Sequence, residues 1–376
     1  MQFKNIIGQQ KIKKTLIQSV KQNRISHAQL FLGAEGVGAL PLAVAYSQYI
    51  NCANPSDDDS CGVCPSCVKF EKLIHPDLHF TFPTIAIDKK KTSNDFIEEW
   101  RKAFIENPYI GELQWLLKLD EEGKKQGNIT VDECKNIFKK IGLKAFEAKY
   151  KTVIIWLPEY LRQEGNILLK LLEEPPEGTL IILVAQDADK VIATILSRAQ
   201  TLKIPKLADE AIKQELIATS GLNEQDAESI SRVSDGNLTF ALTLVNAGRA
   251  DYFELFQNWM RYSYNSKRDV EILSKWMEDC VKSGREFLKS FLTYCQHMMR
   301  ASFIYRYGDK TLLRLNEKET DFVVKFSPFI HSENLAELTK AFNEASMHVE
   351  RNADLKITFL ELSLYIGAQL RRKASA

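Results

Sequence analysis

The chain has 376 residues, of which 45% are hydrophobic and 26% charged, as in ordinary globular proteins. Its 50 Lys and Arg nearly balance its 49 Asp and Glu, so the net charge of +1 gives no strong field for nucleic acid or a membrane surface. The first residues lack the apolar core of a secretory signal, and no run of about 18 apolar residues occurs, so we expect a cytoplasmic protein without a membrane span.

The first half of the chain alternates apolar strands with helical patterns. Residues 28–32 form an apolar run typical of a buried strand, and a helical pattern over 39–50 follows. Residues 152–156 and 180–184 have the same strand character, and a helix is expected over about 161–174 between them. Because strands joined through helices lie parallel, the sequence predicts an α/β domain with a mostly parallel, helix-covered sheet.

The remaining segments divide the chain further. The stretch of about 85–128 is interpreted as an insertion on the sheet domain, and its sequence indicates no role. The strand pattern ends near residue 205, so the sheet domain is placed at 1–205. Residues 206–255 predict a small helical unit, and 256–376 predict a helical domain whose many aromatic side chains pack between helices.

A glycine-rich turn joins the first strand to the helix after it. A working phosphate loop at such a junction reads G-x-x-x-x-G-K-[ST]. Gly33 and Gly38 have this spacing, with Gly36 between them, but Ala39 and Leu40 replace the lysine and the hydroxyl residue. The lysine would reach the phosphates, and the hydroxyl would hold Mg²⁺. The sequence therefore predicts a vestigial phosphate loop that does not bind ATP productively.

The acidic residue that should complete a nucleotide site is also missing. The apolar strand that should end in it continues into Trp156 and Leu157, and Glu159 comes late, after a proline. With lysine, hydroxyl and acid all absent, neither the metal nor the phosphate charge is compensated. The glycine N–H groups could still attract an anion weakly. A plain strand–turn–helix that happens to contain three glycines is the alternative.

Four of the seven cysteines cluster, at Cys52, Cys61, Cys64 and Cys67. In a reducing compartment, such clustering favours a metal over disulfides. Four thiolates suit Zn²⁺ in a closed, structural site, so we predict a zinc module at about 52–67. An iron–sulfur cluster is the rival, and unliganded buried cysteines are the simplest alternative.

Several segments together resemble the clamp-loader subunits of bacterial DNA polymerase III, which are AAA+ proteins. They are the entry to the phosphate loop, the cysteine cluster, a His-Pro-Asp stretch, a signature ending in Leu-Glu-Glu-Pro-Pro, and a Ser-Arg element. These segments lie at 24–33, 52–67, 75–77, 166–176 and 194–198, respectively. Ala199 stands where the family usually has cysteine after the arginine. The resemblance is specific over about 3–205 and only architectural beyond.

The resemblance implies a P-loop sheet domain and a helical lid, followed by a helical collar that assembles a five-subunit ring. In this family the ATP-hydrolysing gamma/tau subunits keep the loop lysine. In the delta-prime type the nucleotide site is typically degenerate while the Ser-Arg element persists, and this sequence resembles that type on both counts. The implied partners are gamma/tau and delta subunits, with the sliding clamp and primer-template DNA reached through the complex.

The resemblance further implies that Arg198 acts as an arginine finger. Such a residue places a planar, permanently charged guanidinium against phosphates held by a neighbouring subunit. Here the phosphates would belong to ATP on an adjacent gamma/tau subunit, and Ser197 would only orient the loop. A surface arginine in an ion pair is the alternative. The implied function is a non-hydrolysing subunit of the loader that supplies this finger and a ring scaffold.

Two further features concern charge. Glu173 and Glu174 end a predicted helix, where negative charge is unfavourable to the helix dipole, so a local partner is expected. In the lid, many active relatives place an arginine in a G-x-x-R element, whereas this chain has Thr239 at that position.

Two rival functions remain. A gamma/tau-like ATPase with an atypical site is opposed by Ala39, Leu40 and Trp156. A zinc-dependent nucleic-acid-binding protein is opposed by the near-neutral charge, because phosphate contacts need clustered Lys and Arg.

Overall fold

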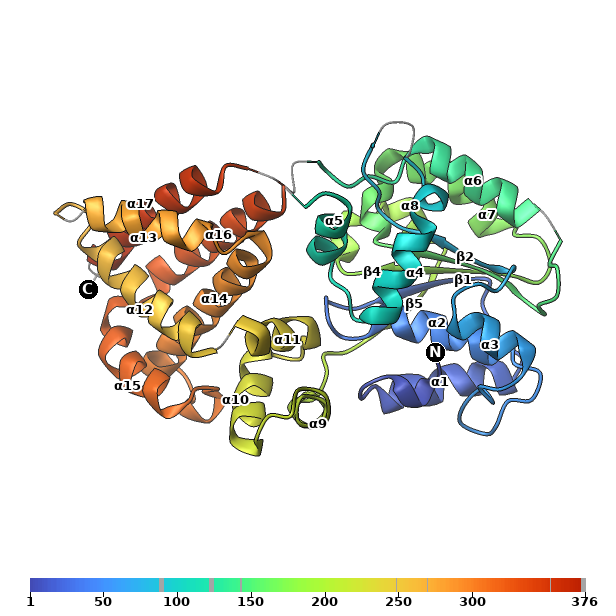
Figure 1. Cartoon of the computed structure of the whole chain (residues 1–376), viewed down its shortest axis with the longest axis horizontal. Coiled ribbons are helices and arrows are strands. Elements are labelled where there is room, and N and C mark those ends of the chain that lie inside the picture. The colour runs from blue at the N-terminus through green and yellow to red at the C-terminus, as the bar shows by residue number, and fades with distance from the viewer. Residues whose placement is uncertain are drawn as a thin grey trace. The chain divides into compact units, whose positions relative to one another are not determined.

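The computed structural model describes residues 1–87, 91–121, 125–142, 144–247, 249–268, 270–351 and 353–372. The chain divides into two compact units (Figure 1). Unit 1 comprises Met1–Ala211 with Gly236–Thr239, and unit 2 comprises Ile212–Asp235 with Phe240–Ala376. The finer division expected from the sequence, with boundaries after residues 205 and 255, stays a prediction.

The sheet of unit 1 has five parallel strands in the order β2-β3-β4-β1-β5, which confirms the predicted parallel sheet. The strands are β1 (Ala28–Leu32), β2 (Leu78–Thr81), β3 (Lys151–Trp156), β4 (Thr179–Ala185) and β5 (Gln200–Lys203). The central strands β1, β3 and β4 are the three predicted from apolar runs. The two edge strands, β2 and β5, are only four residues long and were not predicted.

Both faces of the sheet are buried, because successive strand residues enter opposite cores. Ile154 and Ile182 belong to the core on one face, and their neighbours Ile155 and Ile181 belong to the core on the other. The first core includes residues of α1 (Gln10–Lys21), α2 (Ala39–Ile50), α3 (Pro65–Glu71), α4 (Ile97–Glu106) and α5 (Glu112–Leu119). The second includes residues of α6 (Val131–Gly142), the 3-10 segment η3 (Pro158–Leu168), α7 (Leu169–Glu173) and α8 (Ala193–Leu196) (Figure 1).

The helix predicted over about 161–174 is only partly correct. Residues up to Leu168 form 3-10 turns, and only Leu169–Glu173 is α-helical. Arg162 interrupts the first part with φ 44° and ψ −140°. Gly165 lies so close to α8 that a Cβ there would approach the Cδ1 atom of Ile192 to 2.9 Å. Close packing of α8 therefore overrides the helical periodicity of this segment.

The segment interpreted as an insertion packs on the first face of the sheet. Its residues 88–90 and 122–124 lie outside the described part of the chain. An antiparallel bridge between Thr84 and Asn128 closes the base of the segment. Trp100 and Trp115 are fully buried, and their rings meet edge to face with centroids 5.1 Å apart. The insertion is therefore anchored by aromatic packing.

Within its described residues, the regular secondary structure of unit 2 consists of helices only. It contains most of α9 (Asp209–Ser220) and α11 (Leu238–Ala247), and all of α10 (Glu224–Ser234), α12 (Arg249–Tyr264), α13 (Val270–Val281), α14 (Arg285–Tyr307), α15 (Glu317–Phe326), α16 (Ser332–Glu350) and α17 (Leu355–Arg371). The predicted aromatic packing is confirmed: Trp259 is fully buried, stacks on Trp276 with ring centroids 5.4 Å apart, and donates its Nε1–H to Ser363 Oγ at 2.7 Å.

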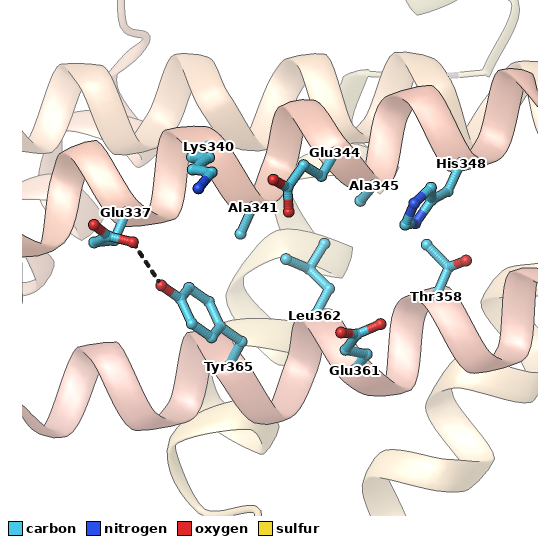
Figure 2. Close-up of a pocket in the computed structure, with 10 residues that line it drawn as sticks. All are labelled: Glu337, Lys340, Ala341, Glu344, Ala345, His348, Thr358, Glu361, Leu362 and Tyr365. Carbon is cyan, nitrogen blue, oxygen red and sulfur yellow. Dashed lines mark hydrogen bonds between the residues drawn. The ribbon is translucent and has the colours of Figure 1, made fainter.

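A groove of about 190 Å³ runs between α16 and α17 (Figure 2). The Tyr365 hydroxyl bridges it by donating to Glu337 at 3.0 Å, and Glu344 and Glu361 also line it. Among the residues described, no helix has both the length and the apolar character needed to cross a membrane.

Candidate functional site

The phosphate-loop segment lies between β1 and α2, as the sequence predicted. Gly36 and Gly38 adopt positive φ values of 77° and 89°, a region in which side chains other than glycine are strained. Ala39 and Leu40 begin α2 with their side chains buried at 7% and 5% exposure. Because both side chains are apolar, this end of α2 offers neither a cation for phosphate nor a hydroxyl for Mg²⁺.

Tyr109, from the turn between α4 and α5, covers this loop. A Cβ on Gly38 would lie 3.0 Å from the Cε1 atom of the Tyr109 ring. The tyrosine hydroxyl accepts a hydrogen bond from the backbone N–H of Ile7 at 2.9 Å, and the side chain is 8% exposed. The segment interpreted as an insertion therefore places the buried ring of Tyr109 directly on the phosphate loop.

The Gly236–Thr239 stretch closes the loop from another side. The backbone N–H of Leu238 donates to the carbonyl oxygen of Gly36 at 3.2 Å, and a Cβ on Gly36 would lie 1.9 Å from Asn237 Oδ1. Thr239, which stands at the arginine position of the G-x-x-R element, donates its hydroxyl to the carbonyl oxygen of Tyr109 at 2.6 Å. Threonine here tethers the covering tyrosine and offers no charge to a phosphate.

The space left at the loop is small. A cavity of about 30 Å³ remains, lined by the loop, by Pro108–Ile110 and by the ends of β3 and β4. Small-molecule sites measure roughly 300–1,000 Å³. The cavity at the loop is therefore much smaller than typical small-molecule sites.

The end of β3 has no acidic ligand at the loop. Trp156 and Leu157 are buried there, at 3% and 1% exposure. Glu159 Oε1 accepts hydrogen bonds from the backbone N–H groups of Gln186 and Asp187 at 2.6 and 2.9 Å. Burial raises the pKa of Glu159, although these donors act in the opposite direction. The Glu159 carboxylate is thus used to hold the end of β4.

The four clustered cysteines come together beside α3. Their four Sγ atoms all lie within 4.8 Å of one another, and they belong to Cys52, Cys61, Cys64 and Cys67. Three backbone N–H groups point at sulfurs: Cys61 N–H at Cys52 Sγ (3.2 Å), Cys64 N–H at Cys61 Sγ (3.3 Å) and Cys67 N–H at Cys64 Sγ (3.5 Å). The cluster can therefore hold one metal ion, and four thiolates are compatible with zinc.

The thiols of this cluster have unequal acidity. Backbone N–H groups of Val63 and Cys64 lower the pKa of Cys61 to about 6, whereas burial raises the pKa of Cys67. A cation that binds all four sulfurs would supply the positive charge that stabilises them as thiolates. The isolated Cys134, Cys280 and Cys295 are buried, as expected for core residues.

The His-Pro-Asp stretch connects the cysteine module to the sheet. Asp77 accepts backbone N–H groups from Phe146, Glu147 and Ala148 at 2.7 to 2.9 Å. The His75 ring packs at a tilt of 36° against Phe70 of α3, with ring centroids 4.5 Å apart, and its Nε2 lies 3.3 Å from Glu147. These contacts assign the stretch a structural role, which the sequence resemblance alone did not define.

The Ser-Arg element follows α8 on the second face of the sheet. The Nε atom of Arg198 lies 2.5 Å from Glu173 Oε1, and Nη1 donates to the carbonyl oxygen of Thr194 at 3.0 Å and to Ser197 Oγ at 3.1 Å. The arginine side chain is 33% exposed and that of Glu173 49%. Glu173 thus has the local partner that its place at a helix end required.

The sequence singles out the loop, the cysteines and Arg198 as candidate site residues, but it gives no indication of Tyr109. The Asn107–Pro108 pair before it marks a turn between two helical stretches. Nothing in the sequence connects that turn to the phosphate loop, because the contact joins residues far apart in the chain.

Comparisons with known proteins point to one group. A family model described as DNA polymerase III, delta subunit, matches residues 8–208. The tau subunit of DNA polymerase III from Bacillus subtilis is 26% identical over 263 residues, which are 69% of this chain and 38% of that protein. The delta' subunit from the same organism is 28% identical over 209 residues, 56% of this chain and 51% of that one. The matched part of the chain thus covers about half of the length of these relatives or less.

Solved structures that match the chain include a DNA polymerase III gamma subunit-related protein from Thermotoga maritima. It is 13% identical, covers 96% of this chain and 99% of its own, and has a TM-score of 0.40. A RuvB mutant from the same organism is 14% identical over 81% of this chain and 80% of its own, with a TM-score of 0.39.

Proposed function

The chain belongs to the family described as DNA polymerase III, delta subunit, and we propose that it is a clamp-loader subunit of the delta-prime type that hydrolyses no nucleotide itself. In this role it contributes Arg198 to ATP held by a neighbouring gamma/tau subunit and forms part of the ring that loads the sliding clamp. Its other partners are the delta subunit and, through the complex, primer-template DNA.

The covered phosphate loop is the observation that carries the proposal. Ala39 and Leu40 remove the side chains that bind phosphate and Mg²⁺, and Tyr109 occupies the space above the loop. A nucleotide would have to displace Tyr109, whose side-chain hydroxyl accepts from the Ile7 N–H and whose backbone carbonyl accepts from the Thr239 hydroxyl. The loop also has no lysine to bind the phosphates. Productive ATP binding is therefore disfavoured both by the displacement of Tyr109 and by the missing cation.

Arg198 supports the second half of the proposal. Its guanidinium is partly exposed, so a phosphate on another subunit can reach it without unfolding of this chain. Arginine is suited to the task because its charge is permanent and its planar donors match phosphate oxygens. Ser197 accepts from Arg198 and so orients the side chain.

The cysteine cluster has a structural role in this proposal. The four sulfurs converge on one point, and a closed four-thiolate site leaves no open position for catalysis. Cys52, Cys61, Cys64 and Cys67 would hold Zn²⁺, which ties the loop after α2 to α3. An Fe–S cluster on the same ligands is the alternative, and the colour and metal content of aerobically purified protein distinguish the two.

A gamma/tau-like ATPase with an atypical site is the second candidate function. It is favoured by the tau match, which extends over more of this chain than the delta' match does. It requires a conformation in which Tyr109 has left the loop and some other cation replaces the missing lysine. Direct measurement of ATP binding separates the two candidates.

The trans role of Arg198 is tested by Arg198→Ala in a reconstituted loader. A finger contributes roughly 10³–10⁵ in rate at the site it serves, so the loader should lose the turnover of the site facing this subunit. Arg232→Ala is the matched control, because Arg232 is also exposed and paired with a glutamate, Glu228. An ATPase rate that is unchanged by Arg198→Ala would show that the finger role is wrong.

A further inference from the structure

Two sequence motifs that lie about twenty residues apart form one hydrogen-bonded unit. The Leu-Glu-Glu-Pro-Pro signature and the Ser-Arg element meet at both of their ends. At one end the Thr194 hydroxyl donates to Asn166 Oδ1 at 3.1 Å, and at the other Arg198 Nε donates to Glu173 at 2.5 Å. Arg198 is therefore not held by its own loop alone.

The hydrophobic core fixes the spacing of this unit. Ile195 of α8 is fully buried in the same core as Leu171 and Leu172 of α7, which are 7% and 1% exposed. Gly165 lets α8 approach closely, since a Cβ there would lie 3.1 Å from the Cδ1 atom of Ile195. Because close-packed cores deform little, Glu173 is presented to Arg198 at a set position.

The hydrogen bonds of Arg198 divide its guanidinium into a held part and an available part. A guanidinium carries five N–H donors. The Nε–H goes to Glu173, and Nη1 donates to Thr194 O and Ser197 Oγ. Within the described part of the chain, Nη2 has no hydrogen-bond partner. Three donor contacts thus fix the plane of the group, and the two Nη2 hydrogens stay available.

The position of Glu173 is otherwise unfavourable. It is the last residue of α7, where the unsatisfied carbonyl groups already carry negative partial charge. The next residue, Glu174, ends the helix before Pro175, where its backbone N–H donates to the carbonyl oxygen of Lys170 at 3.0 Å. Its carboxylate is exposed and makes no hydrogen bond to the described residues. Of two adjacent carboxylates at one helix end, only Glu173 reaches Arg198.

We propose that Glu173 is a positioning residue for Arg198. It holds the Nε edge of the guanidinium so that the Nη2 donors are presented to a phosphate oxygen on the neighbouring subunit. This inference rests on the proposed finger role of Arg198 and adds to it a residue that acts only through the arginine. Without Glu173, the Arg198 side chain loses conformational entropy when the transition state forms. This entropy loss raises the barrier and slows ATP hydrolysis.

The effect should be moderate and should appear in kcat. Ordering one long side chain costs enough to slow the step by roughly 2- to 10-fold. Because the finger acts on charge that develops in the transition state, KM for ATP should change little. Glu173→Gln keeps an oxygen that accepts from Nε and should recover most of the rate that Glu173→Ala loses.

The test uses a loader reconstituted with gamma/tau subunits whose own Ser-Arg arginines are replaced by alanine, so that turnover reports the site facing Arg198. Glu173→Ala, Glu173→Gln and the control Glu174→Ala are compared in steady-state ATP hydrolysis. We expect kcat to fall for Glu173→Ala, to recover largely for Glu173→Gln, and to stay at the unsubstituted level for Glu174→Ala.

The double variant separates a failure of this inference from a failure of the proposed function. If Glu173 acts through Arg198, adding Glu173→Ala to Arg198→Ala changes nothing further. A further loss in that background, or a faster rate for Glu173→Ala alone, would overturn the positioning role while leaving the finger intact. If Arg198→Ala itself leaves the rate unchanged, the finger proposal fails, and this inference fails with it.

Discussion

Tyr109 and the first residues of α2 close the phosphate loop in two independent ways. Ala39 and Leu40 replace the residues that would bind phosphate and Mg²⁺. The Tyr109 ring occupies the space above the loop. If only one of these two obstacles were present, a few substitutions would be expected to restore nucleotide binding. With both in place, we expect that restoring the ligands alone does not restore a nucleotide site, because the remaining cavity measures about 30 Å³.

Nucleotide binding should return only when both the loop residues and Tyr109 are changed. Ala39→Lys with Leu40→Ser should bind no Mg-ATP, because the ring of Tyr109 still covers the loop. Adding Tyr109→Ala should produce weak binding by opening the loop. Calorimetric titration of both proteins checks this, with circular dichroism to confirm that they are folded. Binding by the two-residue variant alone would show that Tyr109 is no barrier.

Asp77 should make the stability of unit 1 depend on pH. Burial acts to raise its pKa, but its three backbone N–H donors together outweigh burial and leave the pKa below its usual value. A lowered pKa means that the carboxylate stabilises the fold fully above about pH 4, the usual value for aspartate, and that this is lost as pH falls through the lowered pKa.

Asp77→Asn should therefore cost about 2 kcal/mol of unfolding free energy at pH 7, because hydrogen bonds to a charged group are the stronger ones. Its unfolding free energy should also depend less on pH between about 5 and 3. Urea unfolding of both proteins over this range provides the measurement. Parallel pH profiles would contradict the assignment.

At the scale of elements, the cysteine module is expected to depend on its metal. Purified protein should contain about one zinc per chain, and strong chelation should lower Tm by at least about 5 °C, since a structural site contributes folding free energy directly. Added Zn²⁺ should restore the original Tm. Brown protein with iron absorbance would instead favour the Fe–S alternative.

Helix α17 packs on α12 through a glycine. A Cβ on Gly367 would lie 2.0 Å from the carbonyl oxygen of Ser263, a backbone atom that cannot move aside. Gly367→Ala should therefore destabilise unit 2 by about 2 kcal/mol or more, although alanine normally favours a helix. Gly142→Ala, at the end of α6 with no atom within 4 Å of the added Cβ, is the control. Thermal unfolding of both variants tests this, and equal Tm values would refute the close approach.

The elements show which signals a single sequence carries. The central strands and α2 could be predicted because long apolar runs and helical periodicity are local properties. Strand β5 could not be, because residues 200–203 are largely exposed and carry no apolar run. The 3-10 character of η3 depends on how closely α8 approaches Gly165, which is a tertiary effect. In the same way, a motif makes Arg198 a candidate site residue, whereas only its contacts draw attention to Tyr109.

At the scale of the whole molecule, the balanced charge has a consequence for DNA. With a net charge of +1, the isolated chain lacks the excess of Lys and Arg that phosphate binding requires. We expect no gel shift of primer-template DNA by the isolated chain at submicromolar concentration. A shift that weakens with added salt would revive the rival interpretation of a zinc-dependent nucleic-acid-binding protein.

The central claim is that this chain serves ATP on a neighbour and binds none itself. Calorimetric titration of Mg-ATP into the isolated chain tests it most directly. The covered loop predicts no detectable heat of binding at millimolar ATP. Micromolar binding would contradict the account, since it would mean that Tyr109 leaves the loop and that an ATPase role must replace the one proposed.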